Sequence, residues 1–232
     1  MRVIITGDPE DLKSRLPLRT EAGKALEWQI LPVLAFEPVE MSPEIATRLK
    51  DFRPHWLIFL SPRGVTFGNR WMLANDYQLS VTTRIACMGE RTRAKAEQEG
   101  WEVDFVPERM GSEGFVEEFL PLLSEKSSIL ILCALQSREY LCTTLGGAGH
   151  SLLVVPVYRT VPSDRVEDPE TAQGVVFTSP SSYEAYKKRW PGLLKSLRLF
   201  AIGEYTATRM REDGVAVNLV PDGNVERLGE IL

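Results

Sequence analysis

Four short segments of this 232-residue chain place hydroxyl or charged side chains directly after an apolar run. Each run is followed by a helical pattern, so each segment is predicted to be a strand-to-helix turn. At a helix N-terminus, the unpaired backbone N–H groups and the helix dipole both favour an anion. The turns therefore predict a site for an anionic ligand. They are Ser61-Pro62-Arg63-Gly64, Gly89-Glu90-Arg91-Thr92, Ser179-Pro180-Ser181-Ser182 and Gly203-Glu204-Tyr205-Thr206.

Each hydroxyl also has a second interpretation, in which it only caps the helix that follows. A serine or threonine at the N-cap contributes about 1 kcal/mol to stability and needs no ligand. Arg63 and Arg138 favour binding, because each follows the end of a predicted strand. Arginines such as Arg91 and Arg159 are instead typical of solvated surface charges. Taken together, the four turns and the two arginines favour a shared anion site.

Other kinds of chemistry find no support in the sequence. The chain has no G-x-x-x-x-G-K-[ST] loop, no G-x-G-x-x-G after a strand and no G-x-S-x-G elbow. His55 and His150 are the only histidines, and neither has partners at metal-ligand spacing. The net charge of −5 argues against non-specific nucleic-acid binding, which needs a basic face. We therefore expect no metal, no cofactor and no nucleic-acid partner.

The cysteines and the N-terminal residues indicate the cellular compartment in which the protein is expected. The three cysteines are odd in number and none forms a C-x-x-C pair, which indicates a reducing compartment. The first residues are predicted to form a strand and lack a secretory signal. No apolar run approaches the length of about 18 residues that a membrane span needs. We expect a cytoplasmic protein with no membrane association.

The elements that must position the turns occur in two copies. Residues 58–65 (IFLSPRGV) are echoed by 176–183 (VFTSPSSY), and residues 85–92 (IACMGERT) by 200–206 (FAIGEYT). A weaker third pair gives the order A–B–A′–B′, which indicates duplication of one module. Four pairs keep a constant offset of 114: Gly89/Gly203, Thr92/Thr206, Gly100/Gly214 and Pro107/Pro221.

Each module is predicted to be a β–α–β unit. Helices are predicted in the stretches 92–100 and 206–214. Each begins at a threonine and ends just before the glycine that closes the stretch. Alternating strands and helices imply a parallel sheet with helices on both faces. The fold class is therefore α/β, with two similar parallel-sheet domains. Buried parallel strands are predicted from short apolar runs at 3–5, 57–60, 129–132 and 175–177.

Two proline-punctuated segments are predicted to connect the domains. Residues 31–43 and 154–162 combine β-type residues with prolines and should be extended. They form a two-segment linker, with its parts near 33–42 and 153–162. Domain 1 is then discontinuous, residues 1–35 with 162–232, and domain 2 is residues 36–161. Two parallel linkers predict a hinge, with the active site in the interdomain cleft.

These stretches resemble the uroporphyrinogen-III synthase family over nearly the whole chain. No single motif is specific, but six occur in the order that the family has. The matching stretches are 58–65 (IFLSPRGV), 88–92 (MGERT), 112–115 (SEGF), 156–160 (PVYRT), 176–182 (VFTSPSS) and 201–207 (AIGEYTA).

The resemblance implies an enzyme that works without cofactor or metal. A member of this family, a cyclising hydro-lyase, dehydrates hydroxymethylbilane and closes it with inversion of ring D. The product is uroporphyrinogen III, for heme and other tetrapyrroles. The substrate carries eight carboxylates, which suits turns rich in anion-binding groups. The resemblance also implies a monomer that receives its substrate by transient hand-over from porphobilinogen deaminase.

The resemblance also implies roles for individual residues. Tyr158 would assist the departure of the hydroxyl, since a phenol can donate a proton or a hydrogen bond. Its alternative role is that of an aromatic packed on the linker. Arg198 is included among the substrate contacts because the family often has a basic residue at that place. The residues expected to bind substrate carboxylates are Ser61, Arg63, Thr92, Arg138, Ser179, Ser182, Arg198 and Thr206.

Some positions depart from the family pattern. Gly7 stands where the family often has arginine, and Ala134-Leu135 stand where it often has Arg-Gly. The loss of two positive charges leaves two other functions open. One is a non-catalytic protein that binds a tetrapyrrole or another polyanion. The other is an α/β enzyme that holds a sugar phosphate or nucleotide in its serine turns.

Overall fold

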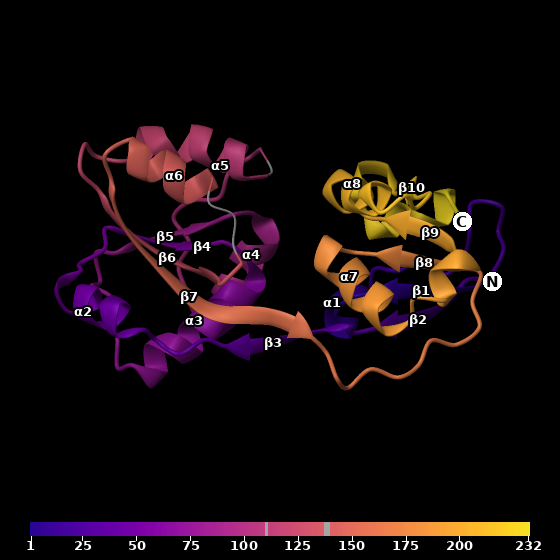
Figure 1. Ribbon diagram of the computed structural model, residues 1–232. Helices are drawn as coiled ribbons and strands as arrows, with labels where there is room; N and C mark the ends of the chain where they lie inside the picture. Colours follow the sequence, from indigo (N-terminus) through magenta and orange to yellow (C-terminus); the bar gives the residue numbers. More distant parts are fainter. Residues whose placement is uncertain (110, 137–139) are drawn as a thin grey trace. The chain divides into compact units, whose positions relative to one another are not determined.

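The chain divides into two compact units. The computed structural model describes residues 1–109, 111–136 and 140–232. Unit 1 comprises Met1–Ala35 and Val161–Leu232, and unit 2 comprises Phe36–Thr160 (Figure 1). The chain thus leaves unit 1 after Ala35, builds unit 2 and returns at Val161.

Unit 1 is built on a parallel sheet in the order β10-β9-β8-β1-β2. The central strand β1 pairs with β2 from the first segment and with β8 from the returning segment, so both segments share one sheet. The strands are β1 (Arg2–Thr6), β2 (Glu27–Leu31), β8 (Gly174–Phe177), β9 (Arg198–Ala201) and β10 (Asn218–Leu219). The helices are α1 (Pro9–Leu12), α7 (Pro180–Arg189) and α8 (Glu204–Glu212), with 3-10 turns η2 (Leu193–Lys195), η3 (Pro221–Gly223) and η4 (Val225–Glu230).

Unit 2 repeats this plan with the sheet order β3-β7-β6-β4-β5. The four strands from β7 to β5 are parallel, and Figure 1 shows β3 running opposite to β7. The predicted α/β class with two largely parallel sheets is confirmed. The strands are β3 (Leu34–Pro38), β4 (Trp56–Phe59), β5 (Arg84–Cys87), β6 (Ser128–Ala134) and β7 (Ser151–Pro162). The helices are α2 (Pro43–Asp51), α3 (Pro62–Ala74), α4 (Glu90–Gln98), α5 (Gly111–Phe119) and α6 (Tyr140–Gly147), with one 3-10 turn, η1 (Leu120–Leu122).

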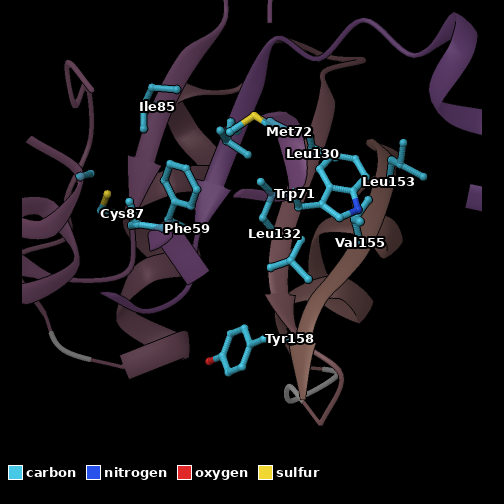
Figure 2. Close-up of a cluster of buried hydrophobic side chains, with 14 of the residues drawn as sticks. Phe59, Trp71, Met72, Ile85, Cys87, Leu130, Leu132, Leu153, Val155 and Tyr158 are labelled. Carbon is cyan, nitrogen blue, oxygen red and sulfur yellow. The ribbon is translucent and has the colours of Figure 1, made fainter. Parts of the chain in front are cut away.

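The sheet of unit 2 is buried on both faces. In β4, Leu57 and Phe59 pack into the cluster on one face, while Trp56 and Ile58 pack into the cluster on the other. Figure 2 shows the first of these clusters, with side chains from several strands and from α3. Burial on both faces explains why each strand is a continuous apolar run in the sequence.

The two predicted connecting segments are strands that pair with each other. Val39 donates its backbone N–H to the carbonyl of Val157 at 3.2 Å, and β3 and β7 are neighbours in the sheet. They are therefore parts of the sheet of unit 2 as well as the places where the chain crosses between units. Pairing satisfies backbone groups that a free linker would leave to water.

A β-bulge interrupts the pairing of β6 with β7. Cys133 pairs with Pro156, and the next residue, Ala134, pairs with Tyr158, so Val157 is skipped. Proline has no N–H to donate to the ladder, which accounts for the irregularity at this point. The bulge changes the alternation of side chains, so Val157 and Tyr158 are both buried, at 1% and 7% exposure.

Helices α4 and α8 begin two residues earlier than predicted. Gly89 and Gly203 occupy the N-cap positions, which makes Thr92 and Thr206 the third residues of their helices. The carbonyl of Gly89 accepts the N–H groups of Thr92 and Arg93, so the helical hydrogen bonds already start there. The threonines are therefore not N-caps, and they are only 4% and 3% exposed.

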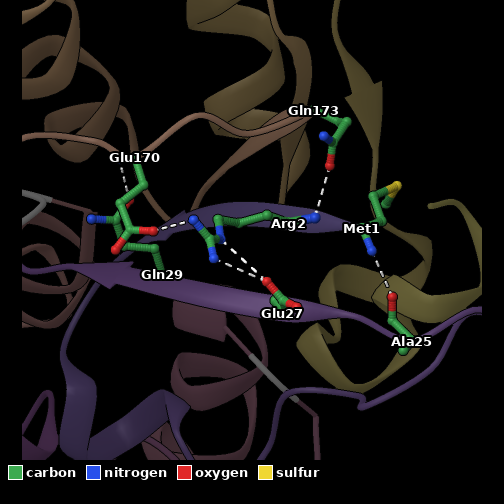
Figure 3. Close-up of polar contacts among 7 residues, drawn as sticks. All are labelled: Met1, Arg2, Ala25, Glu27, Gln29, Glu170 and Gln173. Carbon is green, nitrogen blue, oxygen red and sulfur yellow. Dashed lines mark hydrogen bonds and ion pairs between the residues drawn. The ribbon is translucent and has the colours of Figure 1, made fainter.

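Polar contacts fix the returning segment of unit 1 to its first strand. Figure 3 shows Arg2 of β1 between Glu27 and Glu170, with ion pairs to both. The backbone N–H of Arg2 donates to Oε1 of Gln173 at 2.7 Å, and the N–H of Glu170 donates to Oε1 of Gln29 at 2.8 Å. These contacts join residues far apart in the sequence before β8 enters the sheet beside β1.

Candidate functional site

The turns lie where parallel strands end. In unit 2, Phe59 of β4 is in register with Cys87 of β5 and with Leu132 of β6. The turns that begin at Ser61 and Gly89 therefore follow the same edge of the sheet. Tyr158 joins them there, since it pairs with Ala134 at the end of β6. Of the predicted residues, Ser61, Arg63 and Tyr158 therefore come together at this edge of unit 2.

Ser61 is the N-cap of α3 and also contacts Tyr158. Its Oγ accepts the backbone N–H of Gly64 at 3.0 Å, as a capping serine does. The same oxygen lies 3.1 Å from the hydroxyl of Tyr158, at hydrogen-bond distance. The cap interpretation is therefore correct for Ser61, and its hydroxyl additionally contacts the phenol that the sequence marked as a candidate acid.

Two other aromatic rings hold Tyr158. Its ring stacks on Phe67 of α3, with ring centres 5.1 Å apart and an interplanar angle of 25°. It meets Phe36 of β3 in a T-shaped arrangement, with ring centres 6.1 Å apart. In Figure 2, Tyr158 lies at the margin of the apolar cluster, apart from the other labelled side chains. Tyr158 thus packs as a linker aromatic through its ring, while its hydroxyl contacts the half-buried Ser61.

Arg63 lies one residue beyond Pro62 in the first turn of α3. Its guanidinium carbon is 3.8 Å from the centre of the Phe36 ring, a close cation–π contact. A guanidinium at the N-terminus of a helix adds charge to backbone groups that already favour anions. Ser61, Arg63 and Tyr158 therefore combine an anion-binding side chain with a hydroxyl pair that can exchange a proton.

Phe36 and Phe67 were not predicted as site residues. Phe67 could have been found, because Arg63 and Phe67 are four residues apart on one helix and share a face. Phe36 had no local signal, since its contact with Arg63 depends on the pairing of β3 with β7.

The matching serine turn in unit 1 is internally bonded. Ser179 caps α7, and its Oγ accepts the N–H of Ser182 at 3.2 Å, while the N–H of Ser179 donates to Oγ of Ser182. Thr6 of β1 donates its hydroxyl to Oγ of Ser182 at 2.9 Å. Ser182 is 1% exposed and Thr6 is 0% exposed. The hydroxyl of Ser182 is therefore used inside unit 1, and we do not retain it as a substrate contact.

Arg198 is separated from the other predicted residues. It is the first residue of β9 and pairs with Gly174, the first residue of β8. Ser179 and Gly203 instead follow the last residues of these strands, at the opposite edge of the sheet. The guanidinium of Arg198 donates to the carbonyl of Ile231 at 3.2 Å. Arg198 thus holds the C-terminal segment and is not part of a turn site.

Three further residues were predicted to contact the substrate, namely Arg138, Thr92 and Thr206. Arg138 lies outside the described residues. Thr92 and Thr206 are buried in the first turns of α4 and α8, so their side chains face the interior of each unit. What these two turns offer to a ligand is their backbone amides. Neither N-cap glycine has a side chain that could satisfy those amides.

Local contacts surround the two positions that depart from the family pattern. A Cβ added at Gly7 would lie 2.6 Å from Cδ1 of Leu12, so a larger residue requires Leu12 to move. The N–H of Leu135 donates to the carbonyl of Tyr158 at 2.8 Å, and Gln136 makes two hydrogen bonds with the backbone of Thr160. The segment after β6 is thus attached to β7 through backbone groups.

Other possible sites were considered in the part of the chain that the structure describes. No group of three or more histidine, cysteine or carboxylate residues could hold a metal there. None of the described helices is long and apolar enough to cross a membrane. A cavity of ≈ 760 Å³ lies in unit 2 near Arg84, Trp101 and Asp104. Arg84 begins β5, so this cavity is at the edge of the sheet opposite to Ser61 and Tyr158.

Comparisons with known proteins agree with this fold. Residues 21–227 match the profile of the family described as uroporphyrinogen-III synthase HemD. The structure resembles a uroporphyrinogen-III synthetase from Helicobacter pylori, with a TM-score of 0.67 and 20% identity over 98% of this chain and 96% of that one. It also resembles a mutant uroporphyrinogen III synthase from Thermus thermophilus, with a TM-score of 0.61 and 20% identity over 98% and 94% of the two chains.

A sequence relative covers part of the chain. A Methanothermobacter thermautotrophicus protein, provisionally named uroporphyrinogen-III synthase, is 29% identical over 147 residues. The match spans 56% of this chain and 58% of that protein. The family profile covers most of the present sequence, and the two solved structures share its fold from end to end. The chain therefore belongs to the uroporphyrinogen-III synthase (HemD) family.

Proposed function

We propose that this protein is an active uroporphyrinogen-III synthase, which dehydrates and cyclises hydroxymethylbilane with inversion of ring D. The observation that carries this proposal is the group formed by Ser61, Arg63 and Tyr158 at one sheet edge of unit 2. Membership in the family supplies the reaction, and this group supplies side chains suited to it.

We expect the protein to bind its substrate mainly through the substrate's carboxylates. Eight negative charges require several anion-binding groups, and helix N-termini with a guanidinium are well suited to them. We propose that Arg63, Ser179 and the backbone amides at the starts of α4 and α8 bind carboxylates of the bilane. Arg138 stays in this proposed set on the strength of the sequence alone.

Dehydration requires one proton for each hydroxyl that leaves as water. Tyr158 is the proposed donor, because a phenol can transfer a proton or strengthen a hydrogen bond as the C–O bond breaks. Ser61 contacts the phenol oxygen and can donate to it, which would stabilise negative charge that develops there. Ring closure then depends on holding the flexible bilane in one geometry, which is an effect of binding.

The cellular setting is proposed on the family's chemistry. The substrate closes without help to the isomer I macrocycle, so a short path from the enzyme that makes it is an advantage. We propose transient hand-over from porphobilinogen deaminase to a monomer of this protein in the cytoplasm.

The test supplies porphobilinogen and porphobilinogen deaminase, adds this protein, oxidises the products and separates isomers I and III by chromatography. We expect isomer III, with isomer I in the control that lacks this protein. Isomer I alone, from protein that unfolds cooperatively in a thermal melt, would contradict the proposal. Retained binding of uroporphyrinogen in that case would favour a non-catalytic tetrapyrrole-binding protein.

A further inference from the structure

Phe36 lies between the two side chains that are proposed to act on the substrate. Its ring face carries the guanidinium of Arg63, with 3.8 Å from the guanidinium carbon to the ring centre. It also meets the ring of Tyr158 at an interplanar angle of 68°. Phe36 belongs to β3, Tyr158 to β7 and Arg63 to α3, so three separate elements meet at this one side chain.

The pairing of β3 with β7 determines which way Phe36 points. Successive side chains of a strand point to opposite faces of the sheet. Glu37 forms an exposed ion pair with Arg159 of β7, with 2.7 Å between Oε2 and an Nη atom. Phe36 therefore occupies the other face, where it packs against the apolar cluster of unit 2 that includes Tyr158. The ring of Phe36 thus has packing partners on both β7 and α3.

A guanidinium stacked on such a ring keeps its capacity for carboxylate binding. The cation–π contact engages the face of the ring, while bidentate bonds to a carboxylate use the in-plane N–H groups of the guanidinium. Arginine has a long side chain, and ordering it on binding costs conformational entropy. A ring that already orders Arg63 reduces this cost, so the substrate binds more tightly.

We propose that Phe36 is a positioning residue that orients Arg63 for a carboxylate of the substrate. This inference rests on the proposed function, because it requires that Arg63 contacts the bilane. Tyr158 fixes the ring of Phe36 from the side but is itself held by Phe67 and Ser61. Loss of the Phe36 ring should therefore change KM through Arg63 and leave kcat, which depends on Tyr158, nearly unchanged.

The test is a double-mutant cycle on KM for hydroxymethylbilane. Phe36→Leu should raise KM about two- to fivefold, the fold-change that corresponds to a cation–π contact of about 0.5–1 kcal/mol. Phe36→Tyr keeps the ring and should stay within about twofold of wild type. In the background of Arg63→Met, Phe36→Leu should raise KM no further, because the side chain through which it acts is gone.

Equal effects of Phe36→Leu with and without Arg63 would overturn the inference, since a merely structural role does not depend on Arg63. Phe36→Met provides a second test should Phe36→Leu unfold. It fills similar space without a ring, so KM should rise as it does for Phe36→Leu, and an unchanged KM would overturn the inference. Failure of the proposed function is seen separately, because wild-type protein would then give isomer I before any variant is made.

Discussion

The turns at Ser61 and Ser179 have the same backbone and different surroundings. Both serines cap a helix whose first residue is proline, with φ and ψ of −161° and 160° for Ser61 and −159° and 159° for Ser179. In unit 1, Ser182 completes a capping box and accepts a hydrogen bond from Thr6. In unit 2, the place of Ser182 is taken by Gly64, and Ser61 contacts Tyr158 instead.

The two copies of the duplicated turn differ in what their hydroxyls contact. A side chain at Gly64 would be crowded, because a Cβ there would lie 3.2 Å from the carbonyl oxygen of Leu132. The capping box is therefore absent in unit 2, and the hydroxyl of Ser61 is shared with a phenol from β7. Arg63 stands where unit 1 has Ser181. We infer that the turn of unit 1 mainly stabilises its fold, while the turn of unit 2 carries the chemistry.

The largest effect is expected at Tyr158. Tyr158→Phe keeps the ring contacts and removes the hydroxyl, so kcat should fall by about 10²-fold, at the low end of what a general acid contributes. KM should change little, which steady-state kinetics with hydroxymethylbilane would show.

Tyr186→Phe is the matched control in unit 1. Among the described residues, its buried hydroxyl has no hydrogen-bond partner, and burial raises the pKa of Tyr186 to about 12. Removal of this hydroxyl should leave kcat and the melting temperature at their wild-type values. A loss of kcat equal to that of Tyr158→Phe would remove the special role of the unit 2 turn.

The next effect concerns stability and should be larger in unit 1. Ser182→Ala removes the acceptor of the Ser179 N–H and the shorter of two hydrogen bonds of the Thr6 hydroxyl, which also contacts the carbonyl of Val176. This loss should cost about 2 kcal/mol of unfolding free energy. Ser61→Ala removes one cap and should cost about 1 kcal/mol. Urea denaturation of both variants measures the difference, and a greater loss for Ser61→Ala would reverse the assignment of roles.

A third prediction compares two arginines. Arg63→Met should raise KM by about tenfold, near the low end for loss of a hydrogen bond to a charged group. Arg198→Met should leave KM unchanged, because Arg198 lies at the other sheet edge and contacts the C-terminal backbone. Equal increases in KM would show that the position of Arg198 in the fold does not decide its role.

The smallest effect is a pH dependence shared by the two units. Asp213 ends α8 and accepts a hydrogen bond from Lys187 of α7 at 2.6 Å, and this bond lowers the pKa of Asp213. A lowered pKa in the folded state adds stability at neutral pH, which is lost as pH falls through the folded pKa. Asp213→Asn should therefore lower the melting temperature slightly at pH 7 and reduce its further fall in acid.

Glu99, at the corresponding place of unit 2, provides the counterpart. Burial opposes ionisation of Glu99, but hydrogen bonds from Lys95, Thr66 and Asn69 outweigh it and lower its pKa. Glu99→Gln should have an effect of the same sign, measured by melting curves from pH 7 to acid. A melting temperature that rises with either substitution at pH 7 would contradict the assigned pKa shifts.

Much of the fold was predictable because its signals are local. The buried strands are continuous apolar runs, and the helix ends are marked by Gly100 and Gly214, which have φ of 90° and 73°. The serine turns were predictable for the same reason. Which hydroxyl contacts Tyr158 was not, because Ser61 and its counterpart Ser179 have the same backbone and differ in what the neighbouring elements place beside them.

Other features of the site depend on information that the local sequence does not contain. Arg198 directly precedes an apolar run, yet a strand has two ends, and this residue lies at the end opposite to the turns. The contact of Tyr158 with Ser61 depends on the bulge after Pro156 and on pairing across the sheet. The burial of Thr92 and Thr206 follows from the actual helix starts, which lie two residues before the predicted ones.

The most direct test of the central claim is the isomer III yield of Ser61→Ala beside that of Ser182→Ala, at a temperature where both variants are folded. If the turn of unit 2 carries the chemistry, Ser182→Ala should form isomer III at nearly the wild-type rate, while Ser61→Ala should allow mainly isomer I. Loss of isomer III in Ser182→Ala with full activity in Ser61→Ala would contradict the account.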